Sequence, residues 1–279
     1  MGARDLDKAD SPSTFEPERY WSDRLEQTYS LAGVGWLGLG EPFNRWMYAV
    51  RRRVFRRAIR AGVDLEHARV LDIGSGTGFY VALWGELGVA NITGSDLTGV
   101  AVERLRSHFP GVRFEQLDIS AGQLELEGPY DAISAMDVLF HIVDDEGYAQ
   151  AIRNLALLLA PGGRLIFSEN LLHGETQRAE SQTSRSLGQV EGLLRDAGLE
   201  LELRRPMFVL MNTPVDSNSA FLRRAWTAVN LFVQQGPRWG YLAGSVLFPI
   251  EVALTRWVTE GPSTEIVVCR KVDATTGTA

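Results

Sequence analysis

Val70–Tyr80, with the sequence VLDIGSGTGFY, is the stretch that decides the fold of this chain. Its apolar start predicts a short buried strand, which runs into a glycine-rich turn and then a helix. Glycines at positions 74, 76 and 78 allow a sharp turn and close approach of a ligand. Backbone N–H groups at the start of the helix can point at that ligand. The alternative interpretation is an ordinary strand-to-helix turn without a ligand.

Strands and helices alternate on both sides of this stretch. We expect strands at 68–73, 90–96, 112–117, 130–135, 164–168, 199–211 and 264–269, and helices at 78–87, 100–108, 145–159 and 186–197. The alternation predicts an α/β fold, a Rossmann-like doubly wound sheet of seven mostly parallel strands. Ligands bind such sheets at the carboxyl ends of the strands.

The pattern divides the chain into five segments. We expect a disordered tail (1–17), a helical lid (18–62), the α/β core (63–212), an apolar helical insert (213–262), and a last strand with a tail (263–279). The polar N-terminus lacks the apolar core of a signal peptide. Aromatic residues at helical spacing in the insert favour core packing or a homodimer interface, with a substrate cap or membrane-surface contact as alternatives. Pro249, Glu251 and Arg256 interrupt its most apolar part, which argues against a transmembrane span.

The net charge and the cysteine count limit the partners and the location that can be expected for this chain. The net charge of −7 over 279 residues makes nucleic acid an unlikely partner, because phosphate binding requires a basic face. Cys269 is the only cysteine, so an intrachain disulfide is impossible and a cytoplasmic location is expected.

The segment before the first strand combines aromatic, glycine and arginine residues. We expect a helix at 18–29, a flexible apolar loop at 33–40, and a helix from Pro42 to Ala61. The last helix carries seven arginines: Arg45, Arg51, Arg52, Arg53, Arg56, Arg57 and Arg60. These suggest an anionic partner, but a solvated face that pairs with the acidic remainder of the chain is the favoured interpretation.

Five sequence motifs follow one another in the order that is typical of one known enzyme family. They are Val70–Phe79, the acidic Asp96 located 24 residues after Asp72, Gln116–Ile119, Tyr130–Ile133 with Met136–Ile142, and Leu157–Leu165. Over 66–212 and the final strand, the chain therefore resembles the class I S-adenosylmethionine-dependent methyltransferases. A dinucleotide-binding fingerprint needs a third glycine where Phe79 stands, so that alternative fails.

The resemblance implies S-adenosylmethionine as cofactor and S-adenosylhomocysteine as product. Asp72 is expected to meet the cofactor ammonium, Asp96 the ribose hydroxyls, and Asp118 the adenine amino group. Each carboxylate has a helix N-cap as its alternative role. The remaining expected cofactor contacts are Gly74, Ser75, Gly76, Gly78, Leu97, Ile119 and Met136.

Methyl transfer from a sulfonium requires mainly binding, orientation and exclusion of water. An acceptor hydroxyl or protonated amine also needs a base, whereas a carboxylate acceptor does not. His141 and Asp137 are the candidate bases, and His141 has packing beside the cofactor as its alternative role. The ligand set of the metal-dependent catechol-type enzymes is missing, so we predict no metal.

Aromatic residues in the lid indicate which kind of acceptor the site could bind. Tyr20, Tyr29 and Trp36 suit an aromatic flap, and Glu169 lies where an acceptor could meet it. We expect a small-molecule or peptide acceptor, methylated on O or N in specialised metabolism; it could be a carboxylate if the arginine helix reaches the site. The alternatives are an RNA or protein methyltransferase that uses the arginine helix, and a non-catalytic S-adenosylmethionine-binding interaction protein.

Overall fold

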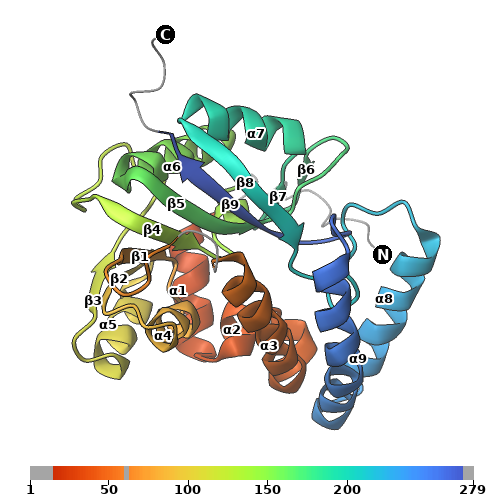
Figure 1. The fold of residues 1–279 in the computed structure, drawn as a ribbon. Helices are drawn as coiled ribbons and strands as arrows, with labels where there is room; N and C mark the ends of the chain where they lie inside the picture. Colours follow the sequence, from red (N-terminus) through yellow and green to blue (C-terminus); the bar gives the residue numbers. More distant parts are fainter. Residues whose placement is uncertain (1–14, 60–62, 273–279) are drawn as a thin grey trace, which may run out of the picture.

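A seven-stranded sheet forms the centre of the molecule (Figure 1). The computed structural model describes residues 15–59 and 63–272. The strand order is β3-β2-β1-β4-β5-β9-β8, and only β9 runs antiparallel to its neighbours. The strands are β1 (Arg69–Ile73), β2 (Asn91–Asp96), β3 (Arg113–Gln116), β4 (Tyr130–Ala135), β5 (Leu159–Glu169), β8 (Leu199–Pro206) and β9 (Glu265–Lys271). This sheet confirms the predicted fold class.

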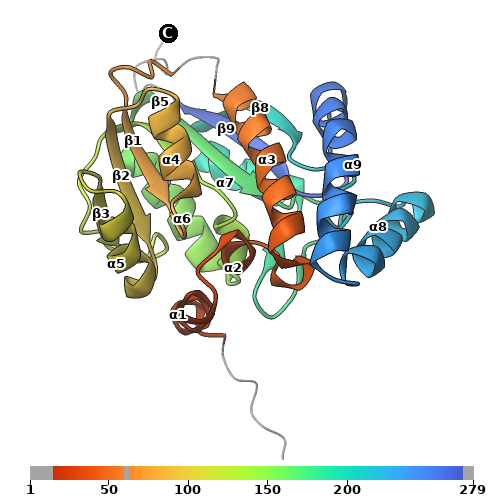
Figure 2. The same cartoon turned by 90° about the horizontal axis from the view of Figure 1, so that it is seen from below.

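Helices cover both faces of the sheet (Figures 1 and 2). One face carries α3 (Gly40–Ala58), α4 (Phe79–Glu86) and α5 (Gly99–His108), and the other carries α6 (Asp145–Leu158) and α7 (Leu187–Asp196). A separate apolar cluster fills each side. The central strands read as continuous apolar runs because both of their faces are buried.

The register of β1 brings the predicted functional positions together. Asp72 lies opposite Ser134 of β4 on one side and Gly94 of β2 on the other. The strands are parallel here, so the carboxyl ends of β1, β2 and β4 meet at one edge of the sheet. The expected site at this edge is therefore built by the pairing of the strands.

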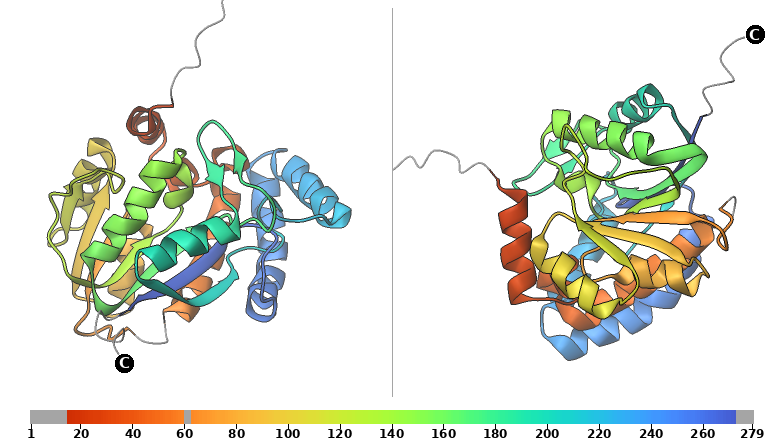
Figure 3. Two further views of the ribbon diagram at one scale, coloured as in Figure 1. Left: turned by 90° about the horizontal axis from the view of Figure 1, so that it is seen from above. Right: turned by 90° about the vertical axis from the view of Figure 1, so that its left-hand side faces the viewer.

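The N-terminal segment is more ordered than the sequence predicts. The expected flexible loop at 33–40 contains the end of helix α2 (Leu31–Val34) and the 3₁₀ turn η1 (Leu37–Leu39). The buried Asn44 amide holds it, because its Nδ2 donates to the carbonyls of Trp36 and Gly40, each at 2.8 Å. Helix α1 (Pro17–Gln27) lies at the periphery of the molecule (Figure 3).

The insert forms two antiparallel helices, α8 (Ala220–Val233) and α9 (Pro237–Trp257). Helix α9 packs between α3 and α8, and Pro249 lies within it. Gly244 allows close contact with α3, since a Cβ there would lie 2.2 Å from Cδ1 of Trp46. Among the described helices, none is long and apolar enough to cross a bilayer.

Some boundaries differ from the prediction. Strand β5 begins at Leu159 instead of Arg164, because Leu159 pairs with Tyr130 before a bulge. Strand β8 ends at Pro206 instead of Met211. The polar linker after β5 contains a small hairpin, β6 (Gln177–Arg178) and β7 (Thr183–Ser184). The expected end of the arginine helix and most of both expected tails lie outside the described residues.

Candidate active site

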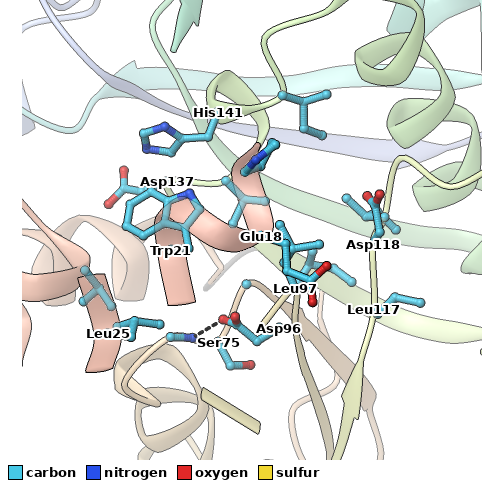
Figure 4. Close-up of a pocket in the computed structure, with 18 of the residues that line it drawn as sticks. Glu18, Trp21, Leu25, Ser75, Asp96, Leu97, Leu117, Asp118, Asp137 and His141 are labelled. Carbon is cyan, nitrogen blue, oxygen red and sulfur yellow. Dashed lines mark hydrogen bonds between the residues drawn. The ribbon is translucent and has the colours of Figure 1, made fainter. Parts of the chain in front are cut away.

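A cavity of about 870 Å³ opens at the carboxyl ends of β1, β2 and β4 (Figure 4). Its floor is the glycine turn after β1, and helix α1 contributes the opposite wall. Of the predicted site residues, the cavity is lined by Gly74, Ser75, Gly76, Asp96, Leu97, Asp118, Ile119, Met136, Asp137 and His141. The turn, the β2 end and the loop after β4 therefore converge as expected.

The glycine turn is shaped by close contacts within the protein. Gly74 has φ +67°, and a Cβ there would lie 2.3 Å from Cγ2 of Val138. Gly78 has φ +84°, and a Cβ there would lie 2.3 Å from Cε2 of Phe109. Both positions require glycine for the backbone and for packing. Gly78 contacts the α5 side of the core and does not line the cavity.

Asp96 ends β2 with a buried carboxylate that organises the turn. Its Oδ2 accepts from the Gly76 N–H at 2.8 Å, and its Oδ1 accepts from the backbone and hydroxyl of Thr98. Burial raises the pKa of this carboxyl. Each carboxylate oxygen accepts about two hydrogen bonds, so Oδ2 retains capacity for a ligand hydroxyl.

Asp118 lies at the outer end of the cavity. Its Oδ1 accepts from the backbone N–H of Ser120 at 2.8 Å and from the Ser120 hydroxyl at 2.6 Å. These contacts fix the carboxylate and leave Oδ2 free for a ligand amino group. Leu97 and Ile119 line the cavity beside it and offer apolar contacts for a planar ring.

Asp72 lies beneath the turn and does not line the cavity. Its Oδ1 accepts from the Ser134 hydroxyl at 2.5 Å, while its buried Oδ2 has no hydrogen-bond partner among the described residues. Burial raises the pKa of this carboxyl to about 7. An unpartnered buried oxygen fits a cationic group, or a water that leads to one, so the site suits the ammonium end of S-adenosylmethionine.

Asp137 begins the loop after β4 and is held on both carboxylate oxygens. Its Oδ1 accepts from the Ser168 hydroxyl at 2.9 Å, and its Oδ2 lies 2.7 Å from Nη2 of Arg51. Its backbone has φ +58°, which is strained for a residue other than glycine. Because both oxygens are bound, Asp137 is better suited to positioning this loop than to accepting a proton.

His141 lies in the cavity wall beside Trp21, with ring centroids 4.9 Å apart (Figure 4). Its Nδ1 lies 2.7 Å from the carbonyl of Ser181. A carbonyl only accepts, so this contact assigns the proton to Nδ1 and leaves Nε2 of the neutral ring as an acceptor. Burial lowers the pKa of His141, which favours that neutral form.

The four predicted acceptor contacts lie outside the cavity lining. Tyr20 packs on Trp21, and Tyr29 donates to the Gly76 carbonyl at 3.2 Å from the far side of the turn. The Trp36 ring packs against Trp226 of α8, with ring centroids 5.5 Å apart. Glu169 is buried on the α6 side of the sheet, where its carboxylate accepts from the Tyr148 hydroxyl at 2.9 Å.

One face of α1 lines the cavity instead. Glu18, Trp21, Ser22 and Leu25 follow helical spacing along that face. The 3.6-residue period of the 18–29 segment places Trp21 on this face and Tyr20 beside it, so that period favours Trp21 as the residue that lines the cavity. Tyr48 of α3 and Tyr80 of α4 also line the cavity; Tyr80 ends the Val70–Tyr80 stretch, whereas no local motif marks Tyr48.

The described arginines of α3 are mostly engaged within the protein. Arg51 is buried against Asp137, and Arg52 and Arg56 both pair with Glu86. Arg57 donates to the Thr255 hydroxyl at 2.8 Å. Arg51 therefore reaches the rim of the site through Asp137, while Arg52 and Arg56 face away from it. Among the described residues, no cluster of histidine, cysteine and acidic side chains could hold a metal.

Comparison with protein-family models matches residues 43–231, more than half of the chain, to a family described as a methyltransferase domain. The chain belongs to this methyltransferase family. Membership confirms the predicted class and its cofactor, S-adenosylmethionine.

Two curated relatives of this methyltransferase are ubiquinone biosynthesis O-methyltransferases. The protein from Xanthomonas oryzae pv. oryzae (strain PXO99A) is 37% identical over 114 residues, which are 39% of this chain and 46% of that protein. The protein from Albidiferax ferrireducens is 30% identical over 105 residues, 36% of this chain and 40% of that protein. The match spans less than half the length of either relative.

The fold is shared with solved methyltransferases. The magnesium protoporphyrin IX methyltransferase of Synechocystis PCC 6803, solved with its bound methyl donor, aligns with a TM-score of 0.56 and 15% identity. That alignment covers 94% of this methyltransferase and all of the other chain. At this identity the likeness concerns the fold alone.

Proposed function

We propose that this methyltransferase transfers a methyl group from S-adenosylmethionine to an oxygen of a small, largely apolar acceptor. One observation carries the proposal: the His141 ring, with Nδ1 on the Ser181 carbonyl, packs on Trp21 and lies across the cavity from Asp96 and Asp118, which leaves Nε2 of the neutral ring to accept a proton. A base in that position suits an acceptor hydroxyl. The O-methyltransferase names of the curated relatives support oxygen over nitrogen.

The lining residues give the cavity a part that suits the cofactor and a part that suits the acceptor. Asp96 and Asp118 present acceptors for the ribose and adenine ends of the cofactor, and the glycine turn lines the cavity with them. When bound, S-adenosylmethionine supplies an activated methyl group. Trp21 and Met136 exclude water and orient the acceptor, because in-line displacement depends chiefly on alignment. His141 takes the acceptor proton on Nε2 while its Nδ1–H stays on the Ser181 carbonyl.

The test measures formation of S-adenosylhomocysteine over a panel of phenols, aliphatic alcohols, amines and carboxylic acids. We expect turnover with phenols, and His141→Asn should lower kcat by about 10²- to 10⁴-fold, because the base is lost. Asparagine can still donate to the Ser181 carbonyl, so the local structure is kept. Because burial lowers the pKa of His141, turnover should fall only below the usual titration range of histidine.

Two controls separate chemistry from cofactor binding. Asp96→Asn should weaken S-adenosylmethionine binding by roughly tenfold or more, since it removes a charged acceptor, while His141→Asn should leave binding within twofold. If carboxylic acids are methylated and this turnover survives His141→Asn, the natural acceptor group is a carboxylate and not a hydroxyl. Cofactor binding without turnover on any acceptor would indicate a non-catalytic binding protein.

A further inference from the structure

Helix α9 carries an exposed apolar stripe along its outer side. Trp239, Leu242, Val246, Ile250 and Trp257 recur at spacings of three, four and seven residues, which place them on one helical face. Their exposed fractions range from 45% for Trp239 to 77% for Trp257. The neighbouring helix α8 adds Phe221, 76% exposed, and Leu231, 59% exposed.

Most of this stripe lies outside the packing of the chain; at its start, the Trp239 ring also contacts Phe232 of α8, with ring centroids 4.9 Å apart. The opposite side of α9 already packs on α3 at the buried Gly240 and Gly244. Figure 2 shows α3, α9 and α8 side by side, with α8 outermost. Exposed apolar surface of this extent marks an interaction site in soluble domains.

The charges around the stripe have one sign. Arg223, Arg224, Arg238 and Arg256 are exposed on the two helices. Glu251 is the only acidic residue in 217–258, and it is buried, accepting from the backbone N–H groups of 209–211. The hairpin is thus cationic on the surface of a chain whose net charge is −7.

Helix α3 extends this basic rim on the other side of α9. Its exposed Arg53 lies over the Phe248 ring at 4.5 Å. Arg238 and the exposed Arg45, which also pairs with Glu41 at 3.2 Å, line an open groove of about 590 Å³ between α3 and α9. The groove is otherwise lined by apolar and aromatic residues, Pro42, Trp46, Ala49, Pro237 and Tyr241. An apolar lining beside the Arg238 guanidinium suits an acyl chain that carries an anionic headgroup.

We propose that the outer face of the α8–α9 hairpin docks on an anionic lipid bilayer. Helix α9 has 21 residues and would lie in the plane of the membrane for roughly 30 Å. Trp239 and Trp257 mark its two ends, and tryptophan favours the membrane–water interface. The arginines would reach lipid phosphates while their stems cover apolar surface.

A second copy of the chain fits this face less well. A twofold interface would bring the same arginines of both copies together without an acidic side chain of the hairpin to pair with them. An anionic lipid surface supplies the opposite charge and accepts the apolar stripe at the same time. The expected homodimer through the insert is therefore the competing outcome of the test.

The experiment is flotation of the full chain with vesicles of phosphatidylcholine alone, or with about one-third phosphatidylglycerol. We expect binding to the anionic vesicles that weakens as salt screens the charges. Arg224→Glu with Arg256→Glu should reduce the partition coefficient by at least about fivefold for each arginine removed. Val246→Ser with Trp257→Ser should reduce it by roughly tenfold or more through lost apolar burial.

Matched controls come from other faces of the molecule. Leu157 of α6 is 76% exposed, and Arg195 of α7 is exposed, so Leu157→Ser and Arg195→Glu should bind vesicles like the unmodified chain. Absence of binding to anionic vesicles, or equal loss in the controls, would overturn the proposal. So would a dimer in light scattering that Val246→Ser with Trp257→Ser converts to monomer, because that result assigns the face to a second copy.

Discussion

A carboxyl group inside a parallel strand is costly to ionise unless a partner reaches it. Oδ1 of Asp72 accepts from the Ser134 hydroxyl, and Oδ2 is buried without a hydrogen-bond partner among the described residues. Burial raises its pKa to about 7. The free carboxyl is therefore largely protonated in mildly acidic solution, and a cation that approaches Oδ2 would favour its ionised form.

This arrangement predicts that cofactor binding releases a proton. The ammonium of S-adenosylmethionine should lower the pKa of Asp72, so affinity should rise as pH rises toward about 7. Calorimetric titration at about pH 6.5 in buffers of different ionisation enthalpy measures the proton count. Asp72→Asn should reduce the release by up to one proton; unchanged release would show that Asp72 does not meet the ammonium.

The Arg51–Asp137 pair positions the loop after β4. Its atoms lie 2.7 Å apart, and the two side chains are 7% and 14% exposed. The Arg51 guanidinium lies between the rings of Tyr48 and Phe208, 4.8 Å from each centroid. Removing one member of such a pair leaves a buried charge without its partner.

We expect Arg51→Met or Asp137→Asn to lower the free energy of unfolding by about 3–5 kcal/mol. The double variant should lose clearly less than the sum, because no buried charge remains. Urea unfolding measures all three. Arg52→Met is the matched control from the same helix; its partner Glu86 is 38% exposed, so the loss should stay within about 1 kcal/mol. Additive losses would show that the pair is not coupled.

At the scale of elements, α1 is fastened by a few polar contacts. Arg24 donates to the carbonyls of Gly33 at 2.6 Å and Gly35 at 2.5 Å, which ties α1 to the α2 segment. Arg104 of α5 donates to the Leu25 carbonyl at 3.0 Å. Leu25 is the only fully buried residue of α1 and its one contribution to the core, so this wall of the cavity should open at a lower free energy than the sheet.

Arg24→Met should loosen α1 while the sheet stays intact. We expect faster amide hydrogen exchange in 17–27 and a several-fold faster dissociation of S-adenosylmethionine, since the lost hydrogen bonds are worth about 1–3 kcal/mol. Exchange in the strands should not change. Arg106→Met is the control, because Arg106 also donates to a backbone carbonyl, that of Phe114, but does not touch α1. Equal exchange in 17–27 for both variants would rule out this fastening role.

At the scale of the whole molecule, Glu251 joins the helical insert to the end of the sheet. Its carboxylate accepts from the backbone N–H of Val209 at 2.5 Å, Leu210 at 2.9 Å and Met211 at 3.4 Å. The side chain is fully buried, so these three donors lie where water cannot replace the carboxylate. The insert and the core should therefore unfold together.

Glu251→Gln should lower the free energy of unfolding by about 1–3 kcal/mol, because the amide replaces one acceptor oxygen with a donor that faces N–H groups. Urea unfolding followed by tryptophan fluorescence and far-ultraviolet circular dichroism measures the change. Glu191→Gln, on an exposed position of α7, should have no measurable effect. A separate early transition of the insert would contradict the joint unfolding.

Local patterns predicted most of the fold. Apolar runs and glycine or proline stops located β1, β2, β4 and α6 to within about two residues. The start of β5 could not be found that way, because it depends on the pairing of Leu159 with Tyr130 across the sheet. The ordered segment at 33–40 depends likewise on Asn44, which belongs to the next helix.

The sequence by itself determined the α/β sheet, the glycine turn and the acidic residues that end its strands, since each depends on neighbours along the chain. Only the tertiary structure decided which side chains face the cavity. Ser168 binds Asp137 at the site, and Glu169, the next residue of β5, points to the other face and binds Tyr148. Successive residues of a strand alternate between faces, and which face holds the site depends on the layer of helices that covers it.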